Sequence, residues 1–217
     1  MPSLLTALLA SFGVVLGCAV AGGELLKVAE RPDGSTAFDS SITTWVVEHR
    51  TDGLTAVARV SSTIGSQAVL IPLVAIALAA LLWRRELAAA GLLAAAWGGA
   101  LGLYSLTKHF VDRPRPPSGI WLTNVGRSSS FPSGHATQSL ATFLALALVG
   151  AVWLPRMRWL GRGLAVGLAA AVGWSRVYLG VHWTTDVGAG WLIGGVWLGV
   201  VAWLGSAARS GGVIRNG

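Results

Sequence analysis

The stretch SSSFPSGHATQSLATFLALALVGAVWLP, residues 128–155, contains no Asp, Glu, Lys or Arg. A helix that crosses a bilayer needs about 20 mostly apolar residues, so this stretch is long enough to form one span. Four further stretches without these charged residues are also long enough: 1–23, 60–83, 87–107 and 187–208. A sixth span is predicted over roughly 159–179, because Arg162 and Arg176 lie near its ends and long basic side chains can reach the interface from there. The sequence therefore predicts an all-α fold, a polytopic membrane helical bundle with six transmembrane helices.

The composition agrees with a membrane protein. Of the 217 residues, 53% are hydrophobic and only 12% are charged, against roughly 25% charged residues in an ordinary soluble domain. A chain so poor in charge cannot cover a water-facing surface, which argues against a soluble enzyme, a disordered chain and a nucleic-acid-binding module. The single cysteine, Cys18, excludes an intramolecular disulfide and a multi-cysteine zinc site. With no segment left over for a soluble domain, we expect one membrane domain over residues 1–217.

The basic residues between the predicted spans set the orientation. The connections after the second and fourth spans and the tail after the sixth carry seven basic residues and one acidic residue. The segment 24–59, on the opposite side, carries four basic and six acidic residues. By the positive-inside rule both termini are expected in the cytoplasm. Segments 24–59, 108–131 and 180–186 then face outward from the cell membrane.

Several ionisable residues on the outward side are not needed for topology. All four histidines are there, with five basic residues: Lys108, Arg113, Arg115, Arg127 and Arg176. Ionisable groups near membrane depth are costly and usually serve a function. Asp112 and Arg113 are expected to pair with each other or with lipid headgroups.

Two short strings on this side predict an anion site. Pro114 and Pro116 end the third predicted span and hold Lys108 and Arg115 near one helix end. The string 131–135, Phe-Pro-Ser-Gly-His, opens the fourth span. A turn that opens a helix leaves backbone N–H groups free at the positive end of the helix dipole, which favours a bound anion.

A third string adds a histidine with a carboxylate partner. Ser175 and Arg176 are followed by His182 and Asp186. Residues four apart share one face of a helix, so the Asp186 carboxylate can accept a hydrogen bond from the His182 imidazole and fix its tautomer. Phosphoryl transfer needs cations for the phosphoryl oxygens, a nucleophile and an acid for the leaving oxygen. One firmly placed carboxylate does not suggest a bound Mg²⁺, so we expect no metal and no cofactor, and the residues alone do not decide which histidine attacks.

Together the three strings resemble the motifs of the type-2 phosphatidic acid phosphatase superfamily, which includes vanadium haloperoxidases and glucose-6-phosphatase. That family carries Lys-x6-Arg-Pro, then Pro-Ser-Gly-His, then Ser-Arg-x5-His-x3-Asp. Here the same identities and spacings occur at 108–116, 132–135 and 175–186. One departure is Thr184, where many relatives have proline.

The resemblance implies a role for each matched residue. His182 would be the nucleophile that forms a phosphohistidine, and Asp186 would orient it and stabilise its developing positive charge. His135 would protonate the leaving oxygen and then activate water. The phosphoryl oxygens would be bound by Lys108, Arg115, Ser133, Gly134 and Arg176.

The expected function is that of an integral membrane phosphatase with its site at the outer side of the cell membrane. The expected partners are the bilayer and a lipid phosphate or diphosphate, such as undecaprenyl diphosphate, phosphatidic acid or phosphatidylglycerol phosphate. A non-enzymatic lipid-phosphate binder or transporter, and a vanadate-dependent haloperoxidase using the same anion site, are the alternatives. A phosphotransferase also fits, because a phosphohistidine can be intercepted by alcohols as well as by water.

Two further expectations concern packing and the long outward segment. Glycines four residues apart, Gly98 with Gly102 and Gly190 with Gly194, let membrane helices approach closely. Within 24–59, the stretches 38–50 and 54–62 are expected to form short helices along the membrane surface.

Overall fold

The computed structural model of the chain describes residues 3–126 and 128–214. Arg127, one of the basic residues singled out above, and Arg215, one of the basic residues counted in the tail, lie outside the described residues. The described residues form eight α-helices and two short 3-10 turns, with no strand. The helices are α1 (Leu4–Val28), α2 (Ala37–Glu48), α3 (Asp52–Ile64), α4 (Gln67–Trp83), α5 (Leu87–Phe110), α6 (Gly134–Trp153), α7 (Arg158–Tyr178) and α8 (Thr184–Ile214), with turns η1 (Ser118–Ile120) and η2 (Pro155–Met157).

The predicted all-helical fold is confirmed, and four helices are long and apolar enough to cross a membrane: α1, α5, α6 and α8. Helices α3 and α4 together make a fifth candidate span, bent by 43° between Ile64 and Gln67. Helix α7 is not among these candidates, because Arg162 and Arg176 lower the hydropathy of an otherwise apolar helix. By length and composition the structure therefore supports four or five of the six predicted spans.

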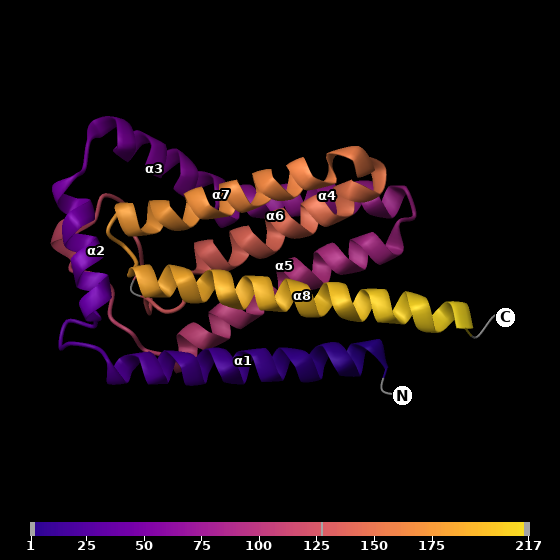
Figure 1. Cartoon of the computed structure of the whole chain (residues 1–217), viewed down its shortest axis with the longest axis horizontal. Helices are drawn as coiled ribbons and strands as arrows, with labels where there is room; N and C mark the ends of the chain where they lie inside the picture. Colours follow the sequence, from indigo (N-terminus) through magenta and orange to yellow (C-terminus); the bar gives the residue numbers. More distant parts are fainter. Residues whose placement is uncertain (1–2, 127, 215–217) are drawn as a thin grey trace.

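The long helices form a bundle with α6 near its middle (Figure 1). Helix α6 packs against α5, α7 and α8, and α1 packs against α5 and α8. Both termini lie at one end of the bundle, and α2 crosses the opposite end (Figure 1). The turns between α4 and α5 and between α6 and α7 lie at the end that carries the termini. The end crossed by α2 therefore holds the segments that were predicted to face outward.

Local sequence explains where the short helices begin. The Thr36 hydroxyl accepts from the Asp39 backbone N–H, and the Asp39 carboxylate accepts from the Thr36 backbone N–H, which is a capping box at the start of α2. Both predicted short helices exist, at slightly different bounds from 38–50 and 54–62. Helix α3 packs against α7 and continues into α4 after the bend, so it is part of the bundle wall.

Helices α6 and α8 approach each other closely where α8 carries Gly190 and Gly194. A Cβ atom on Gly194 would lie 2.5 Å from the Thr137 carbonyl oxygen, and one on Gly190 would lie 2.8 Å from the Ser133 carbonyl oxygen. The predicted close approach is therefore confirmed for this pair. In the other pair, a Cβ atom on Gly102 would lie 3.1 Å from the Phe12 ring of α1, whereas Gly98 faces open space, so the close approach holds for Gly102 alone.

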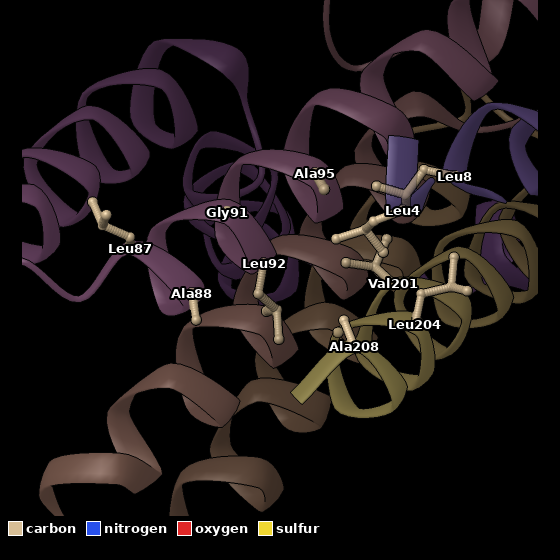
Figure 2. A pocket seen from close by; sticks show the side chains of 11 residues that line it. Leu4, Leu8, Leu87, Ala88, Gly91, Leu92, Ala95, Val201, Leu204 and Ala208 are labelled. Carbon is tan, nitrogen blue, oxygen red and sulfur yellow. The ribbon is translucent and has the colours of Figure 1, made fainter. Parts of the chain in front are cut away.

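A separate apolar pocket of about 390 Å³ lies between α1, α5 and α8 at the terminal end of the bundle (Figure 2). Its walls are aliphatic side chains and glycines, among them Leu8, Gly91, Leu92 and Val201. None of the residues that line it is ionisable. This pocket therefore offers no group for acid–base or nucleophilic chemistry, and the reactive residues are found at the other end of the bundle.

We expect Gly194→Ala to destabilise the fold. The added methyl group would meet the Thr137 carbonyl, and overpacking of this kind costs about 1–3 kcal/mol. The matched control is Gly199→Ala on the same helix, where a Cβ atom meets nothing within 4 Å. Thermal unfolding in detergent should show a lower Tm for Gly194→Ala and an equal or higher Tm for Gly199→Ala; equal Tm values for all three proteins would contradict close α6–α8 packing.

Candidate active site

The three strings singled out in the sequence meet at the end of the bundle crossed by α2. A cavity of about 220 Å³ is lined by six of the eight predicted site residues: Lys108, Arg115, Gly134, His135, Arg176 and His182. Ser133 and Asp186 lie directly behind them, and the Ser133 backbone N–H donates to the Asp186 carbonyl oxygen at 3.1 Å. All eight residues are thus brought to one place from α5, α6, α7, α8 and the connections between them.

His182 lies in the short connection between α7 and α8 and is 3% exposed. Its Nδ1 atom is 3.4 Å from Asp186 Oδ2, and its Nε2 atom is 3.3 Å from Arg115 Nη1. A carboxylate beside Nδ1 favours the tautomer that carries its proton there, which leaves a lone pair on Nε2. The nitrogen with the lone pair is the one beside the cationic side chain of Arg115.

Asp186 is completely buried, and each of its carboxylate oxygens has donors. Oδ2 accepts from the Ser130 hydroxyl at 2.5 Å and from the Trp183 backbone N–H at 2.9 Å. Oδ1 accepts from Arg113 Nη1 at 2.6 Å. A buried carboxylate stays ionised only when it is paired and hydrogen-bonded, and these donors provide both.

The three cations around the cavity are held by neutral oxygens. Arg115 donates to the Val181 carbonyl at 2.6 Å and to the Ser128 carbonyl at 3.0 Å. Lys108 donates to the carbonyl of Ser129, and Arg176 donates to the hydroxyl of Ser62. Within the described residues, none of the three forms an ion pair.

Arg176 is buried, and Lys108 and Arg115 are half-buried. Neighbouring cations with so little solvent and no carboxylate partner are unfavourable by themselves. The buried Nε atom of Arg176 has no hydrogen-bond partner. Burial also lowers the pKa of the Arg115 guanidinium. The cavity wall is therefore suited to an anion with several oxygen atoms, which would supply the missing acceptors and negative charge.

Burial also determines the charge of His182. It lowers the pKa of the imidazole to about 3, against the effect of the hydrogen bond to Asp186, which raises it. The positive charges of Lys108 and Arg115 act in the same direction as burial. His182 is therefore neutral at physiological pH, which is the form that a nucleophile requires.

The expectation for Arg113 was wrong. Arg113 is 1% exposed, and its guanidinium contacts Asp39 at 2.8 Å and Asp186 at 2.6 Å. Asp112 is exposed, because adjacent residues of an extended segment point to opposite sides. Sequence reasoning could not find these partners, since Asp39 is 74 residues away in the chain.

Two further residues on the cavity wall were not predicted. Gln67, at the start of α4, and Tyr104, on α5, both line the cavity, and the Gln67 amide is 3.5 Å from the Tyr104 hydroxyl. The bend between α3 and α4 brings Gln67 to this wall, and no local sequence pattern predicts that bend. Within the part of the chain that the structure describes, no group of three or more His, Cys, Asp or Glu side chains is placed to hold a metal ion.

The family model of the PAP2 superfamily matches residues 68–210, which include all three strings. The chain belongs to the PAP2 superfamily. This confirms the resemblance to the type-2 phosphatidic acid phosphatase superfamily that the three strings indicated.

Curated relatives of this PAP2 protein include two named phosphatases. Phosphatidylglycerophosphatase B of Bacillus subtilis is 29% identical over 177 residues, which cover 78% of this chain and 84% of the relative. An undecaprenyl-diphosphatase of Sulfolobus acidocaldarius is 43% identical over 65 residues, which cover 30% of this chain and only 28% of the relative.

Two solved structures share the fold. The crystal structure of a transmembrane PAP2-type phosphatidylglycerolphosphate phosphatase from Bacillus subtilis superposes with a TM-score of 0.77 at 26% identity, covering 88% of this chain and 96% of that one. Aquifex aeolicus LpxE superposes with a TM-score of 0.62 at 22% identity, covering 77% of this chain and 96% of that one.

We expect the His182 imidazole to remain neutral from about pH 5 to about pH 8, whereas an unperturbed histidine titrates near ~6.5. The sign follows from burial, which disfavours the protonated form. Imidazole ¹⁵N chemical shifts in detergent micelles would measure this, with the His182 signal assigned by its loss in His182→Ala. A shift from the neutral to the protonated signature near pH 6.5 in the folded protein would contradict it.

Proposed function

We propose that this PAP2 protein is an integral membrane phosphatase that hydrolyses a lipid phosphate or diphosphate through a phosphohistidine. The observation that carries the proposal is one cavity lined by a neutral histidine, a second histidine and three unpaired cations. Asp186 supports the first histidine from behind. The inventory matches what phosphoryl transfer requires, and the named relatives are phosphatases.

In the first step the lone pair of His182 Nε2 attacks phosphorus, and a nitrogen–phosphorus bond forms as the bond to the leaving oxygen breaks. His135 donates a proton to that oxygen, so the lipid leaves as an alcohol or as a lipid monophosphate. The positive charge that develops on His182 is stabilised by Asp186 through Nδ1. The negative charge of the bound phosphate favours the protonated form of His135 before transfer.

In the second step His135, now neutral, takes a proton from water, and the resulting hydroxide attacks phosphorus. The nitrogen–phosphorus bond breaks, inorganic phosphate is released and His182 returns to its neutral form. Lys108, Arg115 and Arg176 bind the phosphoryl oxygens in both steps, because fixed cations stabilise the charge of the transition state without reorganisation. Ser133 and the Gly134 backbone N–H complete the phosphate site at the start of α6, where the helix dipole favours an anion.

We further propose six spans and a single membrane domain over residues 1–217. The bent α3–α4 pair is the second span and α7 the fifth, with its arginines near the ends. An even number of spans requires both termini on one side, and both lie at one end of the bundle (Figure 1). The turns at that end carry Arg84, Arg85, Arg156 and Arg158, which supports termini in the cytoplasm and a site at the outer side of the cell membrane.

The substrate is proposed to be an amphiphile. A cavity at the end of a membrane bundle suits a headgroup at the interface while the hydrocarbon tail stays in the bilayer. Phosphatidic acid, phosphatidylglycerol phosphate and undecaprenyl diphosphate all have this form, and the last two agree with the names of relatives.

Purified protein in nanodiscs should release phosphate from lipid phosphates without added metal. His182→Ala should lower the rate by at least about 1000-fold, because a nucleophile cannot be replaced by a methyl group. The matched control is His49→Ala, which removes an exposed histidine stacked on Trp45 and should leave the rate unchanged.

The same assay should compare phosphatidic acid, phosphatidylglycerol phosphate, undecaprenyl diphosphate and a water-soluble sugar phosphate. We expect turnover of at least one lipid and little turnover of the sugar phosphate. Equal phosphate release by the wild type and His182→Ala would overturn the assigned nucleophile. Tight lipid binding without turnover would support a binder instead of an enzyme.

Orientation can be tested by cysteine labelling in a Cys18→Ser background. Ser118→Cys is exposed in the connection between α5 and α6, and Arg84→Cys is exposed in the turn between α4 and α5. We expect a membrane-impermeant maleimide to label position 118 in intact cells and position 84 only after permeabilisation. The reverse pattern would overturn the orientation.

A further inference from the structure

Arg113 is a heavily engaged buried side chain near the site, and within the string 108–116 it occupies a position that the family motif leaves unspecified. Its guanidinium contacts three carboxylates: Nη1 lies 2.6 Å from Asp186, Nη2 lies 2.8 Å from Asp39, and Nε lies 2.7 Å from Glu30. It also donates to the Gly34 carbonyl at 3.0 Å. One side chain therefore joins the α1–α2 connection, α2 itself and the start of α8.

The two oxygens of Asp186 have separate partners. Oδ1 accepts from Arg113, and Oδ2 faces His182 Nδ1 at 3.4 Å. A bond to Oδ1 fixes the rotation of the carboxylate, so that Oδ2 stays directed at the imidazole. We propose that Arg113 is a positioning residue, which holds Asp186 in the orientation that the His182 nucleophile needs and connects that orientation to α2. This inference rests on the proposed phosphatase function.

The neighbouring carboxylates remove a difficulty with this arrangement. A cation on Asp186 would by itself weaken the stabilisation that the carboxylate gives to a positively charged His182. Burial raises the pKa of the Glu30 carboxyl beside the same guanidinium. Asp39 and Asp186 alone already place two negative charges on one positive charge, so the group keeps a net negative charge. Arg113 can therefore fix the geometry of Asp186 without cancelling its electrostatic effect.

Asp39 strengthens the connection to α2 from a second direction. Its Oδ1 accepts from the Thr185 backbone N–H at 2.9 Å, and its Oδ2 accepts from the Thr185 hydroxyl at 2.8 Å. Thr185 directly precedes Asp186 in the first turn of α8. The same carboxylate thus holds Arg113 and the backbone that carries Asp186.

The chemistry of the contact requires arginine. The planar guanidinium directs separate N–H groups to separate acceptors, whereas a lysine ammonium is a compact charge on a flexible stem. An Arg113→Lys variant can keep the contact with one carboxylate but cannot donate to Asp186, Asp39 and the Gly34 carbonyl together. It should therefore fall between the wild type and a variant without the charge.

The test compares kcat and KM of the purified wild type with those of Arg113→Gln, Arg113→Lys and Asp39→Asn in nanodiscs. For Arg113→Gln we expect kcat to fall roughly 10- to 100-fold, because misplacement of a catalytic group slows the chemical step. KM and the inhibition constant of inorganic phosphate should stay within roughly threefold of the wild type, because the phosphate ligands remain. Arg113→Lys and Asp39→Asn should lose less of kcat in the same pattern. The matched control is Arg31→Gln, which removes another hydrogen bond between the α1–α2 connection and α2, from Arg31 to Ser40 at 2.7 Å, and should leave kcat unchanged.

Wild-type kcat in a folded Arg113→Gln protein would overturn the positioning role. An equal loss of kcat in Arg31→Gln would also overturn it. Loss of phosphate binding in Arg113→Gln, Arg113→Lys and Asp39→Asn alike would overturn it too, since Arg113 would then support the fold as a whole. If Arg113→Gln alone fails to bind phosphate, Arg113→Lys and Asp39→Asn are compared instead. A lower kcat with unchanged KM in these two variants supports the positioning role, and a wild-type kcat overturns it. An inactive wild type would instead refute the proposed function, which keeps the two failures distinct.

Discussion

The completely buried carboxylate of Asp186 is the group on which the rest of the site depends. A charge at this position is tolerated only if every part of the carboxylate is hydrogen-bonded. Two donors, Arg113 and Ser130, lie toward opposite ends of the connection between α5 and α6, far from Asp186 in the chain. The third is the backbone N–H of Trp183, three residues before Asp186. Satisfying one carboxylate therefore fixes both ends of the α5–α6 connection, and the turn before α8, against the start of α8.

His182 lies between two regions of opposite charge. On one side are three cations held only by neutral oxygens, and on the other are Asp186 and the carboxylates that share Arg113. Such a separation is costly in the resting protein, because like charges gather on each side. It suits a reaction in which a phosphate dianion enters on the cationic side while positive charge develops on the imidazole toward the carboxylates. The fold maintains this charge separation, and the proposed mechanism uses it.

Much of this site was predictable from the sequence because its residues lie in short strings at helix ends. The spacing from Lys108 to Arg115, the turn before His135, and the four-residue step from His182 to Asp186 are local features, and the motifs place them in one family. The helices themselves follow from long stretches without charge. The partners of Arg113, the place of Gln67 on the cavity wall and the bend after Ile64 were not predicted, since they depend on tertiary contacts with residues far away in the sequence. The status of α7 as a span stays a prediction for a related reason: its arginines lower its hydropathy, and one of them faces the cavity.

The close contact between α6 and α8 has a consequence for the chemistry as well as for packing. His135 stands in the first turn of α6, and Asp186 stands in the first turn of α8 with His182 just before it. Gly190 meets α6 at the Ser133 carbonyl, one turn of helix beyond Asp186. The separation of the two histidines is thus set by how near two helix backbones can come, and not by any bond between the imidazoles. In the proposed mechanism, the missing side chain at Gly190 therefore helps to set the distance between the nucleophile and the proton donor.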